Sequence, residues 1–188
     1  MTLLIGGLLL FSAAHLYPSA MPSARQQMSE KLGSNPYRGL FSLAIVASLV
    51  LIVFGWKAAP QISIYTAPLR GSPIISAFVF GAFVLFVASQ SKTNIRRLVR
   101  HPQMIAVLLW STGHLLANGE SRSLALFGGL GVWAVLEILL CNRRDGTWEK
   151  PAPVDKSRDA ITVVIGAVAF ALILYFHQAL FGVPAWTQ

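Results

Sequence analysis

The sequence predicts an all-α protein, a polytopic transmembrane bundle of about six helices forming a single domain over residues 1–188. Of its 188 residues, 55% are hydrophobic and only 12% are charged. The charged residues cluster between long apolar runs, whereas a soluble domain distributes them over its helical faces. Each transmembrane helix needs about 20 mostly apolar residues, so six spans and their loops account for nearly the whole chain.

The apolar runs define the expected spans, and connectors that are charged or rich in Pro, Gly and Ser separate them. Such connectors do not lie exposed in lipid, because their backbone groups would lack hydrogen-bond partners there. In the fifth run, Gly128, Gly129 and Gly131 are expected to let a neighbouring helix approach closely. The expected spans cover residues 2–20, 39–56, 73–90, 103–119, 123–142 and 160–181.

Basic residues are distributed unevenly among the loops. If the spans alternate in direction, one membrane face holds twelve Lys and Arg residues and the other holds only Lys57, Arg70 and Arg122. The positive-inside bias then places both termini in the periplasm of a bacterial inner membrane. The same bias explains the net charge of +8, so the charge does not indicate nucleic-acid binding.

Polar side chains at membrane depth are costly, and His15, His114 and Glu137 are therefore candidates for function. His15 and His114 lie in helices expected to run in opposite directions, so their side chains lean toward each other across a depth difference of roughly 10 Å. Two imidazoles from facing helices suit the axial positions of a haem iron. The alternative is that each histidine only forms a hydrogen bond with a neighbouring helix.

Two interpretations of Glu137 remain open. It is placed either to accept a hydrogen bond from Nδ1–H of a ligating imidazole, or to pair with Arg144 at the end of the same helix. The single cysteine, Cys141, excludes a disulfide framework and is interpreted as a packing residue. His177 is expected near the outer face in a structural role.

The run RRLVRHPQ precedes the fourth span and contains Arg96, Arg97, Arg100 and His101. Its arginines are suited to binding an anionic lipid headgroup or a cofactor propionate through charge-assisted hydrogen bonds. Positive-inside anchoring is the simpler interpretation and explains most of the run.

Residues 100–119, RHPQMIAVLLWSTGHLLANG, resemble the NnrU family of bacterial membrane proteins. The segments LFSAAHLYP, LFGGLGVWAVLEI and HQALFGV agree, so the resemblance covers nearly the whole chain. Members of this family are linked to nitric oxide and nitrite metabolism in denitrifying bacteria. The family also looks like the plant 15-cis-zeta-carotene isomerase, which uses haem b and whose ligand-type histidines match His15 and His114. The resemblance therefore implies haem b and, if the protein is an enzyme, redox or isomerase-like chemistry on a hydrophobic or gaseous ligand.

Two alternatives from other functional classes stay open. The RHP block is similar to membrane methyltransferases, in which case Arg100 and His101 would contact S-adenosylmethionine. Met104 stands where those enzymes usually have tyrosine, which counts against this interpretation. A non-catalytic accessory protein for respiratory complexes would use its histidines only as contacts between helices.

Overall fold

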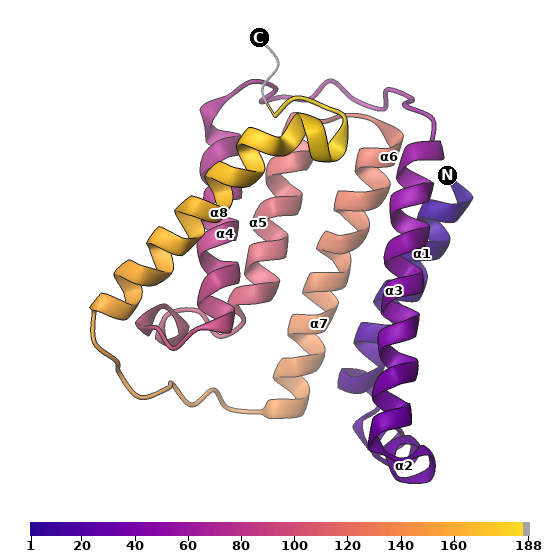
Figure 1. Cartoon of the computed structure of the whole chain (residues 1–188), viewed down its shortest axis with the longest axis vertical. Helices are drawn as coiled ribbons and strands as arrows, with labels where there is room; N and C mark the ends of the chain where they lie inside the picture. Colours follow the sequence, from indigo (N-terminus) through magenta and orange to yellow (C-terminus); the bar gives the residue numbers. More distant parts are fainter. Residues whose placement is uncertain (186–188) are drawn as a thin grey trace. The chain divides into compact units, whose positions relative to one another are not determined.

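The computed structural model describes residues 1–185, and its regular elements in that range are helices apart from one isolated bridge between Ser63 and Glu120 (Figure 1). The predicted all-α class is therefore confirmed. Contacts divide the chain into two compact units. Unit 1 comprises Met1–Tyr65 and Glu120–Gly146, and unit 2 comprises Thr66–Gly119 and Thr147–Gln188.

Unit 1 contains α1 (Thr2–Ala20), α2 (Pro22–Leu32), α3 (Ser34–Ala58), α6 (Ser121–Ser123), the π-helical turn η2 (Leu124–Gly128) and α7 (Gly129–Asp145). Helix α1 packs against both α3 and α7. The short helix α2 lies in a segment that the sequence predicts to be a connector only. It begins at a proline, has no buried residue and ends at Gly33, whose φ of 85° suits glycine.

Helices α1 and α3 approach each other closely at two glycines. A Cβ atom on Gly55 would lie 2.3 Å from the backbone nitrogen of Leu4, and one on Gly7 would lie 2.8 Å from the backbone nitrogen of Ile52. A Cβ on Gly128 or Gly129 would make only ordinary contacts, at 3.8 and 3.4 Å. The prediction of close approach at those two glycines is therefore wrong, because their neighbours there are leucine side chains and not the backbone of another helix.

Unit 2 contains α4 (Pro73–Gln90), the 3-10 turn η1 (Asn94–Arg97), α5 (Pro102–Ala117) and α8 (Ser157–Phe181). Helix α4 packs against both α5 and α8. A Cβ on Gly166 of α8 would lie 2.9 Å from the Cα of Val84 in α4. A small residue at this position thus lets the two helices pack with their backbones close together.

Five helices are long and apolar enough to cross a membrane: α1, α3, α4, the continuous segment Ser121–Asp145, and α8. The remaining expected span, the fourth, corresponds to α5, which has 16 residues and a length of about 24 Å, less than the 30 Å of a typical hydrocarbon core. Pro102 opens α5, and it ends before Asn118. Many large apolar side chains on the long helices are exposed, for example Leu9 at 66% and Val164 at 60%, as expected for surfaces that face lipid.

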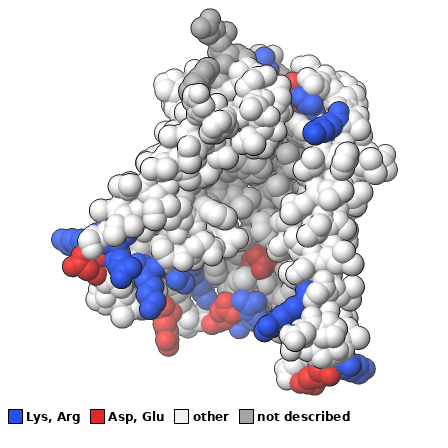
Figure 2. Space-filling view, in the orientation of Figure 1, with Lys and Arg blue, Asp and Glu red and all other residues white. Residues whose placement is uncertain are grey.

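Basic residues gather at one end of each unit. In unit 1, a hydrogen bond from Ser19 to Glu137 places the C-terminal ends of α1 and α7 together, and α2 links this end to the start of α3. Arg25, Lys31, Arg38, Arg143 and Arg144 lie there. In unit 2, Lys92, Arg96, Arg97, Arg100, Lys156 and Arg158 lie where α4 ends and α8 begins, and blue atoms gather around that end of α8 in Figure 2. Within each unit, the charge segregation expected from the sequence is confirmed.

Arg122, expected in a connector at the membrane face with few basic residues, is buried, with 7% of its surface exposed. Its Nε donates to Glu120 at 3.1 Å, and its guanidinium carbon lies 4.5 Å from the centre of the Trp56 ring. With its oxygen turned toward the guanidinium, the Gln61 amide accepts hydrogen bonds from both terminal nitrogens. These contacts join the end of α3 to the start of α6 in unit 1.

In unit 2, Asn94 fastens the long connector before α8 to the end of α4. Its side-chain amide donates to the Val154 carbonyl at 2.8 Å and accepts from the Val154 N–H at 3.0 Å. The same amide donates to Asp159 at 2.9 Å, and the backbone N–H of Asn94 donates to that carboxylate at 2.7 Å. One side chain thus connects η1, the connector and the first turn of α8.

Replacing Asn94 by alanine is expected to lower the free energy of unfolding by about 2 kcal/mol, because three hydrogen bonds are lost at once. The connector should also be released, so trypsin should cleave faster after Lys156, which is followed by a serine. The measurement is thermal unfolding in detergent together with a proteolysis time course. Asn35→Ala, an exposed position on α3, is the matched control and should match wild type in both assays.

Candidate functional site

His15 is held in a defined tautomer by its own helix. Its Nδ1 lies 2.9 Å from the backbone carbonyl of Phe11, one turn earlier in α1. A carbonyl oxygen can only accept, so Nδ1 carries the proton and the neutral ring has its lone pair on Nε2. The Phe11 ring lies against the imidazole with centroids 4.1 Å apart.

His114 has the same local geometry in unit 2. Its Nδ1 lies 2.8 Å from the backbone carbonyl of Trp110, one turn earlier in α5, and the two rings have centroids 5.0 Å apart. The neutral imidazole of His114 therefore also carries its lone pair on Nε2. Asn118 ends the helix by donating from both its backbone N–H and its side-chain amide to the His114 carbonyl.

The two histidines share a local sequence. Residues 11–16 read FSAAHL and residues 110–115 read WSTGHL, so each histidine follows an aromatic residue by four positions and a small residue by one. The small residue has a packing role in α5, where a Cβ on Gly113 would lie 3.1 Å from the Cβ of Phe78 in α4. This shared six-residue pattern is the sequence signal that pairs the two histidines.

Aromatic side chains surround His15 in unit 1. Trp133 of α7 meets the imidazole edge-on at 5.4 Å, and Phe41 of α3 does so at 5.9 Å. Trp133 is 5% exposed, yet within residues 1–185 its Nε1–H has no hydrogen-bond acceptor. A buried donor without an acceptor is costly, so it indicates a place where an acceptor from outside the chain is needed. Trp133 is thus a site residue that only its packing, and no sequence pattern, identifies.

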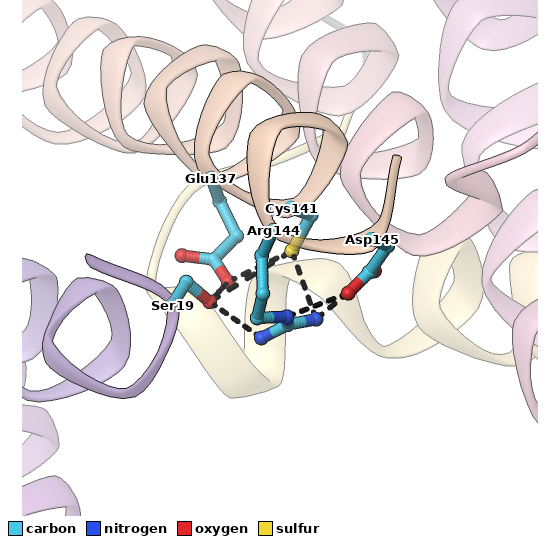
Figure 3. A network of polar contacts seen from close by, with 5 residues as sticks. All are labelled: Ser19, Glu137, Cys141, Arg144 and Asp145. Atoms are coloured by element: carbon cyan, nitrogen blue, oxygen red, sulfur yellow. Dashed lines mark hydrogen bonds and ion pairs between the residues drawn. The ribbon is translucent and has the colours of Figure 1, made fainter. Parts of the chain in front are cut away.

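Glu137 lies one turn after Trp133 on α7 and joins a polar network with the end of α1 (Figure 3). Its Oε1 accepts from the Ser19 hydroxyl at 2.5 Å and from the Cys141 thiol at 3.4 Å. Arg144 donates to Ser19 at 3.3 Å and pairs with Asp145 at 2.7 Å. The second carboxyl oxygen, Oε2, is buried and has no partner in the part of the chain that the structure describes.

The interpretation of Glu137 as the partner of an imidazole Nδ1–H therefore needs correction, whereas Glu137 and Arg144 do belong to one polar network. The Nδ1 of each candidate imidazole donates to a backbone carbonyl, so Glu137 does not orient either ring through that atom. Arg144 reaches Ser19 and Asp145, and so its link to Glu137 runs through the serine hydroxyl. The backbone carbonyl four residues before each histidine orients its imidazole ring, so no second side chain is needed for that purpose.

The remaining candidates lie in unit 2. His101 precedes α5, and its carbonyl accepts the N–H of Ile105, so it occupies the start of the helix next to Arg100. The Nδ1 of His177 lies 2.8 Å from the carbonyl of Val183, at the end of α8. His177 therefore ties down the end of its own helix, consistent with a structural role.

The donor set suits haem iron. A neutral imidazole with Nδ1 bonded to a carbonyl presents Nε2 to a metal, and the backbone bond fixes the orientation of the ring. Among the described residues, no group of three or more His, Cys, Asp or Glu side chains is arranged to hold a metal ion. His15 with its aromatic neighbours in unit 1, and His114 with Trp110 in unit 2, are the candidate ligands.

The comparisons with known proteins identify one family. The description "NnrU protein" belongs to a family profile that matches residues 3–185, nearly the whole chain. No curated protein and no solved structure matches the chain. The matched range includes residues 100–119, which carry the resemblance noted above, and the segments around His15 and His114. The chain therefore belongs to the NnrU family.

Proposed function

We propose that this protein binds haem b in the membrane and that His15 and His114 are each a candidate imidazole ligand of haem iron. The observation that carries the proposal is the matching geometry of the two histidines. Both donate from Nδ1 to the carbonyl four residues earlier, and both lie against the ring of that same residue. The fixed Nδ1 proton makes Nε2 the metal-binding atom of each ring.

The surroundings of His15 support the same proposal. Phe11, Phe41 and Trp133 provide an apolar wall suited to a porphyrin face. The buried Trp133 N–H is available to a carboxylate or another acceptor of the bound group, and it would then no longer be unsatisfied. When bound, haem b supplies an iron centre that exchanges an electron or acts as a Lewis acid toward a hydrophobic or gaseous ligand.

The resemblance noted from the sequence implies a link to nitric oxide and nitrite metabolism, so nitric oxide is the first gaseous ligand to test. The test of haem binding is the absorbance spectrum of the protein expressed with ample haem precursor and purified in detergent. We expect a Soret band and about one haem b per chain in a pyridine haemochrome assay. A chain purified intact without a Soret band contradicts the proposal.

A calorimetric titration with S-adenosylmethionine separates this proposal from a methyltransferase-like role at Arg100 and His101. We expect no binding heat. Saturable binding of S-adenosylmethionine by a haem-free chain would favour the methyltransferase alternative. A chain that binds neither group would favour the non-catalytic accessory role.

A further inference from the structure

One surface of unit 2 carries an excess of positive charge. The segments 92–101 and 154–159 hold six basic and two acidic residues, a formal excess of +4 with His101 neutral. Because Asn94 binds Val154 and Asp159, the two segments lie side by side. The basic residues are Lys92, Arg96, Arg97, Arg100, Lys156 and Arg158.

The two acidic residues of this surface are engaged elsewhere. Asp159 accepts hydrogen bonds from the Thr93 hydroxyl and from the backbone and side chain of Asn94. Hydrogen bonds from the side chain and backbone of Ser157, and to a smaller extent the charge of Arg158, lower the pKa of Asp155. Within residues 1–185, neither carboxylate forms an ion pair with Lys92, Arg96 or Arg97.

Arg97 distinguishes this surface from simple positive-inside anchoring. An anchoring arginine extends its guanidinium into water or among the headgroups, where every N–H finds a partner. Arg97 is only partly exposed, and its Nε is buried without an acceptor in the described part of the chain. A guanidinium nitrogen removed from water needs an anionic acceptor, and a phosphate oxygen has the geometry to bind a guanidinium at two nitrogens.

The location of the surface identifies the source of the phosphate. It lies between the end of α4 and the start of α8, two helices long and apolar enough to cross a membrane. The termini of such helices lie at the depth of lipid headgroups. We propose that Arg97 and the neighbouring basic side chains of this surface bind the phosphodiester of an anionic phospholipid, which would be held there as a bound lipid. This inference does not depend on haem.

The structure also explains why this surface would bind a particular lipid and not only attract charge. Asn94 fixes η1 against the connector and α8 through hydrogen bonds on both sides of its amide. The backbone that carries Arg96 and Arg97 is therefore tied at its start. A tied backbone loses less conformational freedom on binding than a mobile loop does.

The test is native mass spectrometry of the full-length protein released from detergent, titrated with phosphatidylglycerol or phosphatidylcholine. Both lipids have a phosphodiester, but only phosphatidylglycerol has a net negative charge. We expect wild type to bind the first phosphatidylglycerol molecule at least about fivefold more tightly than the first phosphatidylcholine molecule. One additional basic contact with an anionic lipid provides a difference of this size. Arg97→Gln should lose about fivefold in phosphatidylglycerol affinity and little in phosphatidylcholine affinity.

Arg143→Gln is the matched control, because Arg143 is an exposed arginine near the end of α7 in unit 1. It should stay within twofold of wild type. Arg97→Lys keeps the charge and tests geometry, and we expect an affinity between those of wild type and Arg97→Gln. If Arg97→Gln does not fold, Arg97→Lys alone decides, since it should still bind phosphatidylglycerol more weakly than wild type.

Three results would overturn the proposal. They are equal affinities for the two lipids, equal losses in Arg97→Gln and Arg143→Gln, and displacement of the bound lipid by excess inorganic phosphate. The last result would assign the surface to a free anion.

Discussion

Replacing His15 or His114 by alanine is expected to lower the haem content of the purified protein at least about tenfold. Loss of a partner that only orients a metal ligand already costs 10–100-fold, and loss of the ligand itself should cost no less. Both histidines carry their proton on Nδ1, so each substitution removes the Nε2 lone pair that would bind the iron. The measurement is haem per polypeptide from the pyridine haemochrome assay, with the spin state read from the absorbance spectrum.

His177→Ala is the control for the histidine variants. His177 is also a histidine near the end of a long helix, but its Nδ1 is bonded to Val183, six residues later, and it lacks the shared aromatic motif. It should retain haem at the wild-type level. A His15→Gly variant should regain haem when free imidazole is added, because the small ligand replaces the missing ring.

Particular outcomes would reject the ligand assignment while leaving haem binding intact. Unchanged haem content in both His15→Ala and His114→Ala is one. Loss of haem in His177→Ala alone is another, because it would identify His177, near the end of α8, as the ligand.

Replacing Gly55 by alanine is expected to destabilise unit 1 by about 3 kcal/mol, at the upper end of the usual cost of overpacking. The added Cβ would lie 2.3 Å from the Leu4 nitrogen and 2.6 Å from its Cα. Both atoms belong to the backbone, so α1 as a whole must move away from α3. Thermal unfolding in detergent should show a midpoint roughly 6–12 °C lower.

Gly39→Ala is the matched control on the same helix, because a Cβ there has nothing within 4 Å. Both substitutions gain the same helix propensity, so the difference between them isolates the contact with α1. We expect Gly39→Ala to be as stable as wild type or slightly more so. Equal midpoints for the two variants would show that α1 and α3 do not meet at Gly55.

The spans were predictable because they depend on composition alone. Long runs without charge have no other stable location than a membrane, and their ends were placed close to the observed helix ends. The exceptions have local causes. Pro102 and the Asn118 cap shorten α5 to 16 residues, and the polar segment after Met21 forms α2 without burying any side chain.

The site was predictable only as a list of residues. His15, His114 and Glu137 stood out because polar groups at membrane depth are rare and costly. Their partners did not stand out, because a bond from Nδ1 to the carbonyl of Phe11 or Trp110 involves backbone atoms that no residue pattern marks. Trp133 is an ordinary apolar residue in the sequence, and only packing shows that its N–H lacks an acceptor.

The sequence by itself determined the class of protein, most of the spans and the gathering of basic residues at one end of each unit, because hydropathy and charge act on each segment separately. Tertiary structure decided which glycines are essential and which polar groups lack partners. Gly55 and Gly166 meet backbone atoms while Gly39 and Gly128 do not, although all four look alike in the sequence. The same holds for Arg97 and Arg143, since the burial of a guanidinium nitrogen depends on neighbours distant along the chain.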